Sequence, residues 1–451
     1  MRKLTVDASR DPVTSDVLFV LQVRTIKEPF LPKLKTFKCE NADEGFIPFI
    51  PTLLSRTATS IDIEFTEDTP TLTVASIVTR LSILCPDLEY IILNDLPKDP
   101  AITEAVSEML LACNRNALQC FYADSLLTEE ARNVLFQLPK LCYLWVVIQG
   151  RTLLPPVALP NLYTIDVEFG DHLDWLQGFR GIMSGNLRNV YFTSDSEQIG
   201  DFLDEFKNVA LTTSVPAVLQ EFKFHTPHSW NPSYRSLLPF TQLRELLIEF
   251  SCENGCSSRL DDNIIFDLTR AMPELRILQL GGSPCRTGGR VTIRGLIALA
   301  GNCRLLSKLC IHFQTPSLVA MARFGVTISP DKTVVLRQDC ALTDLEVGEL
   351  PISGDNAAVL VTMALLQIFP RLYNIEFTGG RWENVLEFIR ATRRLGSFIQ
   401  VISKAYLSYV RSYSVTFCQT TTMVSGHQRN NVFPSFLDRT HIAEVTPGNP
   451  R

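Results

Sequence analysis

The sequence has no run of 18 apolar residues and no apolar segment behind its first charged residues. The first absence argues against a transmembrane helix. The second argues against a secretory signal peptide, because Asp7, Arg10 and Asp11 interrupt the stretch where an apolar core would lie. The only Asn-x-Ser/Thr triplet begins at Asn231 and is blocked by its proline. These absences predict a cytoplasmic or nuclear protein with no membrane partner.

The chain also lacks an excess of basic residues and the short motifs of common enzymes. Its net charge is −6, which argues against nucleic acid as the partner. It contains no Gly-x-Ser-x-Gly and no His-Glu-x-x-His sequence. The glycine-rich stretch 281–290 lacks the Gly-Lys-Ser/Thr ending of a phosphate-binding loop, so we expect a plain loop there. We therefore predict a protein that is not an enzyme and needs no cofactor.

What the chain does contain is a repeated phrase, apolar-Pro-x-Leu-x-x-apolar-x-apolar, in about fourteen copies. Clear copies begin at Cys85, Leu159 and Met272. With the first leucine, or the residue in its place, as position one, the copies start at Met1, Leu34, Ala58, Leu88, Leu118, Leu141, Leu162, Leu187, Leu219, Leu243, Leu275, Leu306, Leu342 and Leu372. Their intervals run from 21 to 36 residues. The shorter intervals fit the ~20–29 residues of a leucine-rich repeat, and the longer ones require insertions.

Each copy predicts a short strand followed by a helix. Positions one, four and six are apolar and should face a shared core, while positions three, five and seven should face away from it. Apolar residues with helical spacing occur between copies, around 74–84, 102–110 and 293–300, and again at 382–389. The pattern predicts an α/β leucine-rich-repeat-like solenoid, a right-handed horseshoe with strands on its concave side and helices outside.

The phrase assigns residues 1–395 to this solenoid, and its start at Met1 predicts an array that begins upstream. Residues 324–339 predict an inserted hairpin around a Pro-Asp-Lys turn. Residues 396–420 are apolar and β-branched, and we expect a C-terminal cap there. Residues 421–451 predict a disordered tail.

The copies at 342–348 and 368–375 resemble the repeats of fungal F-box proteins with irregular leucine-rich repeats. The resemblance covers roughly residues 1–395 and implies the substrate-recognition part of a ubiquitin-ligase receptor. In that family an N-terminal F-box binds a Skp-type adaptor, and no F-box-like segment with a Leu-Pro-x-Glu opening precedes the first copy. Adaptor binding would therefore need an F-box upstream. The alternative is a leucine-rich-repeat interaction protein unrelated to ubiquitin transfer, and the sequence does not identify the partner, the oligomeric state or the biological process.

Aromatic side chains gather at the outward positions of consecutive copies. They are Tyr90, Tyr122, Tyr143, Trp145 and Tyr191, with Asp166 on the copy that interrupts them. Tyr and Trp are enriched at interface hot spots. A row of acids follows at position seven: Asp7, Glu40, Glu64, Asp124, Glu168 and Glu249. The pattern predicts that the concave face binds a basic, partly hydrophobic protein. The structural alternative is that aromatics simply favour strands and that the carboxylates solvate the rim.

Cysteine and histidine are present without the grouping that a metal site requires. Cys252 and Cys256 stand close together, as do Cys310 and His312, but no second pair lies at short spacing from either. We therefore predict no metal. Several of the 12 cysteines occupy apolar positions and should be buried thiols. His225 and His312 share position seven, where we expect both at the surface.

Overall fold

A computed structural model describes residues 1–8, 30–149, 159–170, 175–183, 186–197, 199–251, 260–281, 290–313, 340–347, 352, 355–377 and 382–395. The chain forms two compact units, Met1–Arg390 and Ala391–Arg451, and the first contains all the strands and sites discussed below. The predicted hairpin, C-terminal cap and tail lie outside the described residues, as do Cys252, Cys256 and most of the glycine-rich stretch.

Fourteen parallel strands form one open sheet, and their order in space is their order in the chain. The strands are β1 Lys3–Asp7, β2 Thr36–Ala42, β3 Ser60–Phe65, β4 Tyr90–Asn94, β5 Cys120–Ala123, β6 Tyr143–Ile148, β7 Thr164–Phe169, β8 Asn189–Ser194, β9 Glu221–Thr226, β10 Glu245–Phe250, β11 Ile277–Leu280, β12 Lys308–Ile311, β13 Asp344–Val347 and β14 Asn374–Phe377. Parallel neighbours require a crossover between them, and each interval of the repeat supplies one. The prediction of an α/β solenoid is confirmed.

The strands pair in register, apart from one irregularity between Cys39 and Ala42 of β2, so equivalent phrase positions lie side by side across the sheet. Position three of β4, Tyr90, pairs with position three of β5, Cys120, which pairs in turn with Tyr143 of β6. Within β4, Ile91 and Leu93 are fully buried while Tyr90 is exposed. The predicted alternation is confirmed, because a slip of one residue would bring the polar positions into the core.

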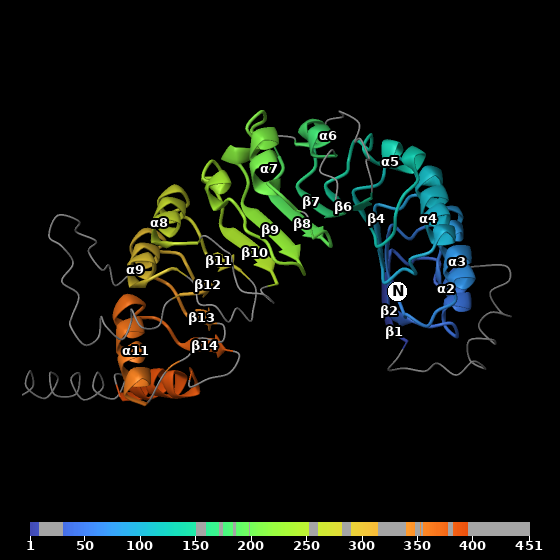
Figure 1. Cartoon of the computed structure of the whole chain (residues 1–451). Coiled ribbons are helices and arrows are strands. Elements are labelled where there is room, and N and C mark those ends of the chain that lie inside the picture. The colour runs from blue at the N-terminus through green and yellow to red at the C-terminus, as the bar shows by residue number, and fades with distance from the viewer. Residues whose placement is uncertain are drawn as a thin grey trace, which may run out of the picture. The chain divides into compact units, whose positions relative to one another are not determined.

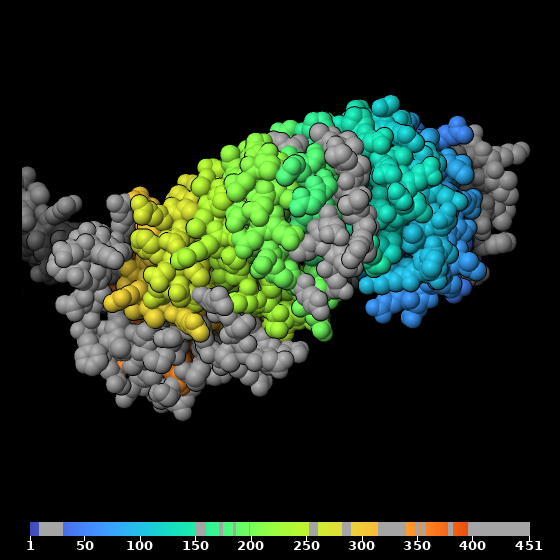
Figure 2. Space-filling model, turned by 45° about the horizontal axis from the view of Figure 1, so that its top comes forward, coloured from blue at the N-terminus to red at the C-terminus, as the bar shows by residue number. Residues whose placement is uncertain are grey.

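The helices cover one face of the sheet, as Figure 1 shows for the first unit. They are α2 Ile50–Leu53, α3 Thr71–Leu84, α4 Pro100–Ala112, α5 Glu129–Leu135, α6 Trp175–Ile182, α7 Phe202–Ala210, α8 Asp262–Ala271, α9 Ile293–Asn302 and α11 Asp355–Ile368, with a further helix over 382–395. Short 3-10 turns η1 Ile47–Phe49, η2 Val215–Ala217 and η3 Tyr234–Leu237 complete the crossovers. Figure 2 shows the repeats following one another along the surface in chain order, as expected where each repeat packs on its neighbours.

Local sequence explains where several helices begin. The hydroxyl of Thr128 accepts a hydrogen bond from the backbone N–H of Ala131 at 3.3 Å, which caps α5. The carboxylate of Asp99 accepts from the N–H of Ala101 in the same way at 2.8 Å, just before the proline that opens α4. Thr128 and Asp99 thus each satisfy one backbone N–H at the start of a helix.

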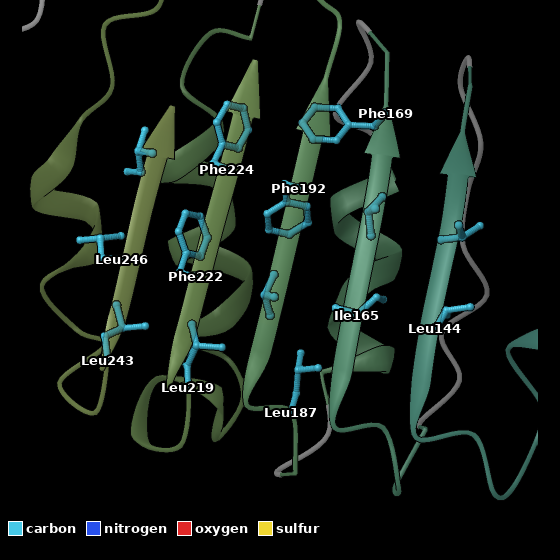
Figure 3. Packing of buried hydrophobic residues seen from close by; sticks show 14 of the residues in the cluster. Leu144, Ile165, Phe169, Leu187, Phe192, Leu219, Phe222, Phe224, Leu243 and Leu246 are labelled. Atoms are coloured by element: carbon cyan, nitrogen blue, oxygen red, sulfur yellow. The ribbon is translucent and has the colours of Figure 1, made fainter. Parts of the chain in front are cut away.

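The core between the sheet and the helices is rich in aromatic rings around β7 to β9, where phenylalanines replace the leucines of other repeats. The ring of Phe192 lies 5.0 Å from that of Phe202, 5.5 Å from that of Phe206 and 6.0 Å from that of Phe222, measured between centroids. Figure 3 shows Phe192 and Phe222 among the buried side chains of neighbouring strands. Burying such rings stabilises this stretch by about 1.5–3 kcal/mol each.

Candidate protein-binding surface on the inner face of the sheet

The inner face is the sheet face opposite the helices, and it carries positions three, five and seven of each strand. Its charged residues are thirteen carboxylates and four lysines, without an arginine: Asp7, Glu40, Asp62, Glu64, Asp124, Asp166, Glu168, Glu221, Glu245, Glu249, Asp344, Glu346, Glu376, Lys3, Lys38, Lys223 and Lys308. This excess of acid is larger than the net charge of the whole chain, which is −6. The inner face is therefore the acidic side of the array.

Three of the lysines each lie between two carboxylates. The ammonium of Lys223 is 3.5 Å from a carboxylate oxygen of Glu221 and 3.5 Å from one of Glu245. It also lies 4.7 Å from the ring centroid of Tyr191. Lys38 likewise forms ion pairs with two carboxylates, those of Glu40 and Asp62. Lys308 does so with Glu346 and Glu376. These pairs contribute only ~0–1 kcal/mol each to stability, but they neutralise their stretches of the face.

Asp124, Asp166 and Glu168 have no such lysine. Within the described residues their carboxylates form no ion pair and no side-chain hydrogen bond. Burial raises the pKa of Asp166 to about 6, with a further upward contribution from Glu168 and a downward one from Lys223. Burial also raises the pKa values of Asp124 and Glu168, which Lys98 partly offsets. For all three groups the effect of burial on the pKa outweighs that of the nearby lysine, so their desolvation is only partly compensated.

An aromatic stack lies beside these carboxylates. The rings of Tyr122 and Trp145 are 4.7 Å apart between centroids and inclined by 26°. Trp145 pairs in register with Asp166, and Asp166 pairs with Tyr191 on the next strand. Burial, followed by the charge of Asp124, raises the pKa of Tyr122 to about 12. We call Tyr122, Asp124, Trp145, Asp166 and Glu168 the acidic–aromatic site.

The structure places the sequence-predicted residues unequally. Tyr122, Trp145 and Asp166 come together, but Trp145 is only 6% exposed, so it lies within the face rather than projecting from it. The hydroxyl of Tyr191 donates a 2.5 Å hydrogen bond to Glu221, which ties Tyr191 to the network around Lys223. Tyr90, which is 38% exposed, donates to Gln119 at 3.2 Å and does not join the stack.

Tyr143 precedes the stack on β6 and is half-buried, with its pKa raised by burial. Asp124 and Glu168 belong to the acidic row predicted at position seven, but their position alone does not distinguish them from its other members. The distinguishing feature is Val147, which stands at position seven of β6, between the strands that carry these two acids. The sequence shows an apolar residue at position seven of one copy and acids at position seven of the copies before and after it. Only the strand register shows that these three positions are neighbours in the sheet.

One expectation about histidine was wrong. His225 is exposed and lies 3.2 Å from Glu249, but His312 is only 6% exposed. The neighbouring strand has Gly281 at the equivalent position, with a φ of +105°. A Cβ atom at Gly281 would lie 3.3 Å from Cδ2 of His312, so the missing side chain leaves the space that the imidazole fills.

The described cysteines are free thiols, and burial raises the pKa values of Cys39, Cys85, Cys113, Cys120, Cys303 and Cys310 to about 12. Such thiols are protonated at neutral pH and are poor nucleophiles. In the described part of the chain, no three residues of the metal-binding types converge on one point. None of the helices described there combines the length and hydrophobicity that crossing a membrane requires.

Comparison with known proteins adds little to this geometry. No family model matches the chain, and no curated protein is significantly similar to it. Among solved structures, a Bacteroides fragilis protein determined by the Northeast Structural Genomics Consortium aligns at 12% identity with a TM-score of 0.29. The alignment spans 62% of this chain and 66% of that one, just under two thirds of its length. The fold itself, repeated strand–helix units in one parallel sheet, defines an α/β solenoid suited to holding a protein partner.

Proposed function

We propose that this protein is a non-enzymatic scaffold that binds a basic, partly hydrophobic protein segment at the acidic–aromatic site. The observation that carries the proposal is the set of half-buried carboxylates at Asp124, Asp166 and Glu168. Among the described residues these form no ion pair, whereas Lys223 pairs with two carboxylates elsewhere on the inner face. A lysine or arginine from a partner would complete the arrangement that Lys223 makes within the chain.

The aromatic stack gives the site an apolar component. A cation beside the half-buried ring of Tyr122, which stacks on Trp145, gains from the carboxylates and from the rings together. Because Trp145 is packed before any partner arrives, little side-chain freedom is lost on binding. Preorganisation of this kind favours a specific partner over general adhesion of basic proteins.

For the biological role, we propose the substrate-recognition part of an F-box ubiquitin-ligase receptor in the cytoplasm or nucleus. The support is the resemblance of the repeat phrase to that family, together with the acidic–aromatic site on the inner face. The test is co-purification of a Skp-type adaptor with the native protein, tagged at its C-terminus and expressed from its own locus. Failure to recover the adaptor, while the peptide binding tested below persists, would favour a repeat scaffold unrelated to ubiquitin transfer.

Peptide selection tests the binding site directly. Random peptides displayed on phage are selected against the purified full chain, and we expect enrichment of Lys or Arg flanked by apolar residues. Replacing both aromatic residues, Tyr122→Ala with Trp145→Ala, should weaken binding of a selected peptide by about tenfold or more. Fluorescence anisotropy measures the affinity, and circular dichroism confirms that the variant remains folded.

Tyr373→Ala is the matched control, because this tyrosine is 62% exposed and lies immediately before β14, outside the site. It should bind the selected peptide like the wild type. The proposal fails if selection yields no basic preference. It fails equally if the double variant, folded, binds the peptide with unchanged affinity.

A further inference from the structure

A row of arginines lies along the edge of the sheet where strands β8 to β12 begin. Arg188, Arg244 and Arg276 occupy position two of their repeats, and Arg304 lies two residues before Leu306, position one of the β12 repeat. The backbone N–H of Arg276 donates to the carbonyl of Arg244 at 2.7 Å, which places these two residues on adjacent strands. Arg188 is two strands from Arg244, with Gln220 on the strand between them.

These arginines have no carboxylate partner within the described residues. Arg244, Arg276 and Arg304 are exposed and form no ion pair there, and Arg188 lies over the ring of Tyr163 at 5.8 Å. Neighbouring strands are ~4.8 Å apart, so Arg244 and Arg276 bring like charges close together. The nearest acids on the inner face, Glu221 and Glu245, are already engaged by Lys223.

We propose that this arginine row binds an acidic segment of a protein. A guanidinium group pairs with a carboxylate through two parallel hydrogen bonds, and it does so better than an ammonium group. Guanidinium groups held at strand spacing would contact successive acidic side chains of an extended segment. The surface is distinct from the acidic–aromatic site, and the proposal stands without it.

The adjoining face favours a protein segment over a nucleic acid. Next to the arginine row lie Glu221 and Glu245, which would repel a continuous polyanion that overlapped the inner face. An acidic peptide can place its charges on the edge alone. A segment that carried acidic residues here and basic residues at the acidic–aromatic site would be fixed in one orientation.

The competing structural role is compensation of helix dipoles. Helices α8 and α9 end at Ala271 and Asn302, close in sequence to Arg276 and Arg304, and cations near helix C-termini are stabilising. That role predicts a loss of stability when the arginines are removed. The binding role predicts a loss of peptide affinity at unchanged stability, so the two can be separated.

The probe is a fluorescein-labelled peptide of alternating Glu and Gly, measured by anisotropy against the full chain. We expect saturable, salt-sensitive binding that the double variant Arg244→Gln with Arg276→Gln weakens by about tenfold or more. The matched control is Arg80→Gln, which removes an exposed arginine of α3 that has no ion pair within the described residues. It should change the affinity less than about twofold.

A charge-reversed variant and an oligonucleotide probe test the alternatives to peptide binding. The charge-reversed variant Arg244→Glu with Arg276→Glu should lose the Glu peptide and gain a Lys–Gly peptide. The proposal is overturned if the wild type does not bind the Glu peptide, or if Arg80→Gln weakens binding as much as the double variant. It is also overturned if the double variant lowers the thermal midpoint without changing affinity, or if a single-stranded oligonucleotide binds in place of the peptide. Because the Glu–Gly probe is acidic, the outcomes measured with it do not bear on the acidic–aromatic site.

Discussion

Two stretches of the inner face carry the same kinds of residue and use them differently. Around β9 and β10, Lys223 lies between Glu221 and Glu245 and above the ring of Tyr191, so acids, cation and aromatic satisfy one another. Around β5 to β7, Asp124, Asp166 and Glu168 lie beside the Tyr122–Trp145 stack with no lysine between them. The backbone ladder is the same in both stretches, so the difference lies in single side chains.

The comparison shows that one repeat array can use some of its charged residues for internal ion pairs and leave others for binding a partner. A charge balanced within the chain leaves nothing for a partner, whereas a desolvated and unbalanced carboxylate gains free energy when a cation reaches it. The unbalanced stretch lies beside the most aromatic part of the core, around Phe192, Phe202 and Phe206. Burial beneath the sheet can thus offset the cost of carboxylates left unpaired above it.

The largest expected effect comes from removing that support. Phe192→Ala deletes a fully buried ring between β8 and helices α6 and α7, and should lower the free energy of unfolding by about 3–5 kcal/mol. Urea unfolding monitored by circular dichroism measures the loss. Leu299→Ala, a buried leucine on α9, should weaken folding of its own repeat and leave peptide binding at the acidic–aromatic site intact. A loss for Phe192→Ala below about 1 kcal/mol would contradict a supporting role.

The sequence was sufficient for the fold because a strand buried on one face has only one acceptable register. Positions one, four and six are apolar in β4, and Leu88, Ile91 and Leu93 are fully buried there. The lower burial of the first strand was not predicted. Leu4 and Val6 of β1 carry the same pattern yet are only half-buried, because β1 has no neighbour on one side in the described sheet.

The site was predictable only in part. The aromatic cluster and its acids could be read from position numbers, because alternation fixes which side of the sheet they take. The ion pairs could not be predicted, because pairing depends on how far each lysine reaches across strands. Lys223, at position five, is paired in register with Leu247 but forms an ion pair with Glu245, at position three of that strand. The burial of His312 likewise follows from a missing side chain on another strand, at Gly281.

A second, smaller effect tests whether Asp166 is desolvated in the folded chain. Its folded pKa of about 6 exceeds the ~3.9 of an unfolded aspartate, so the folded state binds the proton more tightly. Wild-type stability should therefore rise as the pH falls from 7 to 4. Asp166→Asn should be more stable than the wild type at pH 7 by about 1–3 kcal/mol, and the advantage should vanish near pH 4.

Urea unfolding at a series of pH values measures this difference. Asp68→Asn, which neutralises an exposed carboxylate between β3 and α3, is the matched control and should show little difference at either pH. If Asp166→Asn and Asp68→Asn behave alike, Asp166 is solvated and the contrast with the Lys223 stretch weakens.

The smallest expected change in stability gives the sharpest test of the comparison. Val147→Lys would supply the missing cation between β5 and β7, where Val147 pairs with Glu168. Its stem can stay on the face while the ammonium reaches the carboxylates, so the free energy of unfolding should change by less than about 1 kcal/mol. A basic peptide should nevertheless bind about tenfold or more weakly, as measured by anisotropy, because its cation site is filled. The control variant is Val147→Met, whose side chain is similar in length to lysine but uncharged. It should bind the basic peptide with the wild-type affinity. Equal affinities for the lysine and methionine variants would mean that the unpaired carboxylates do not attract the partner.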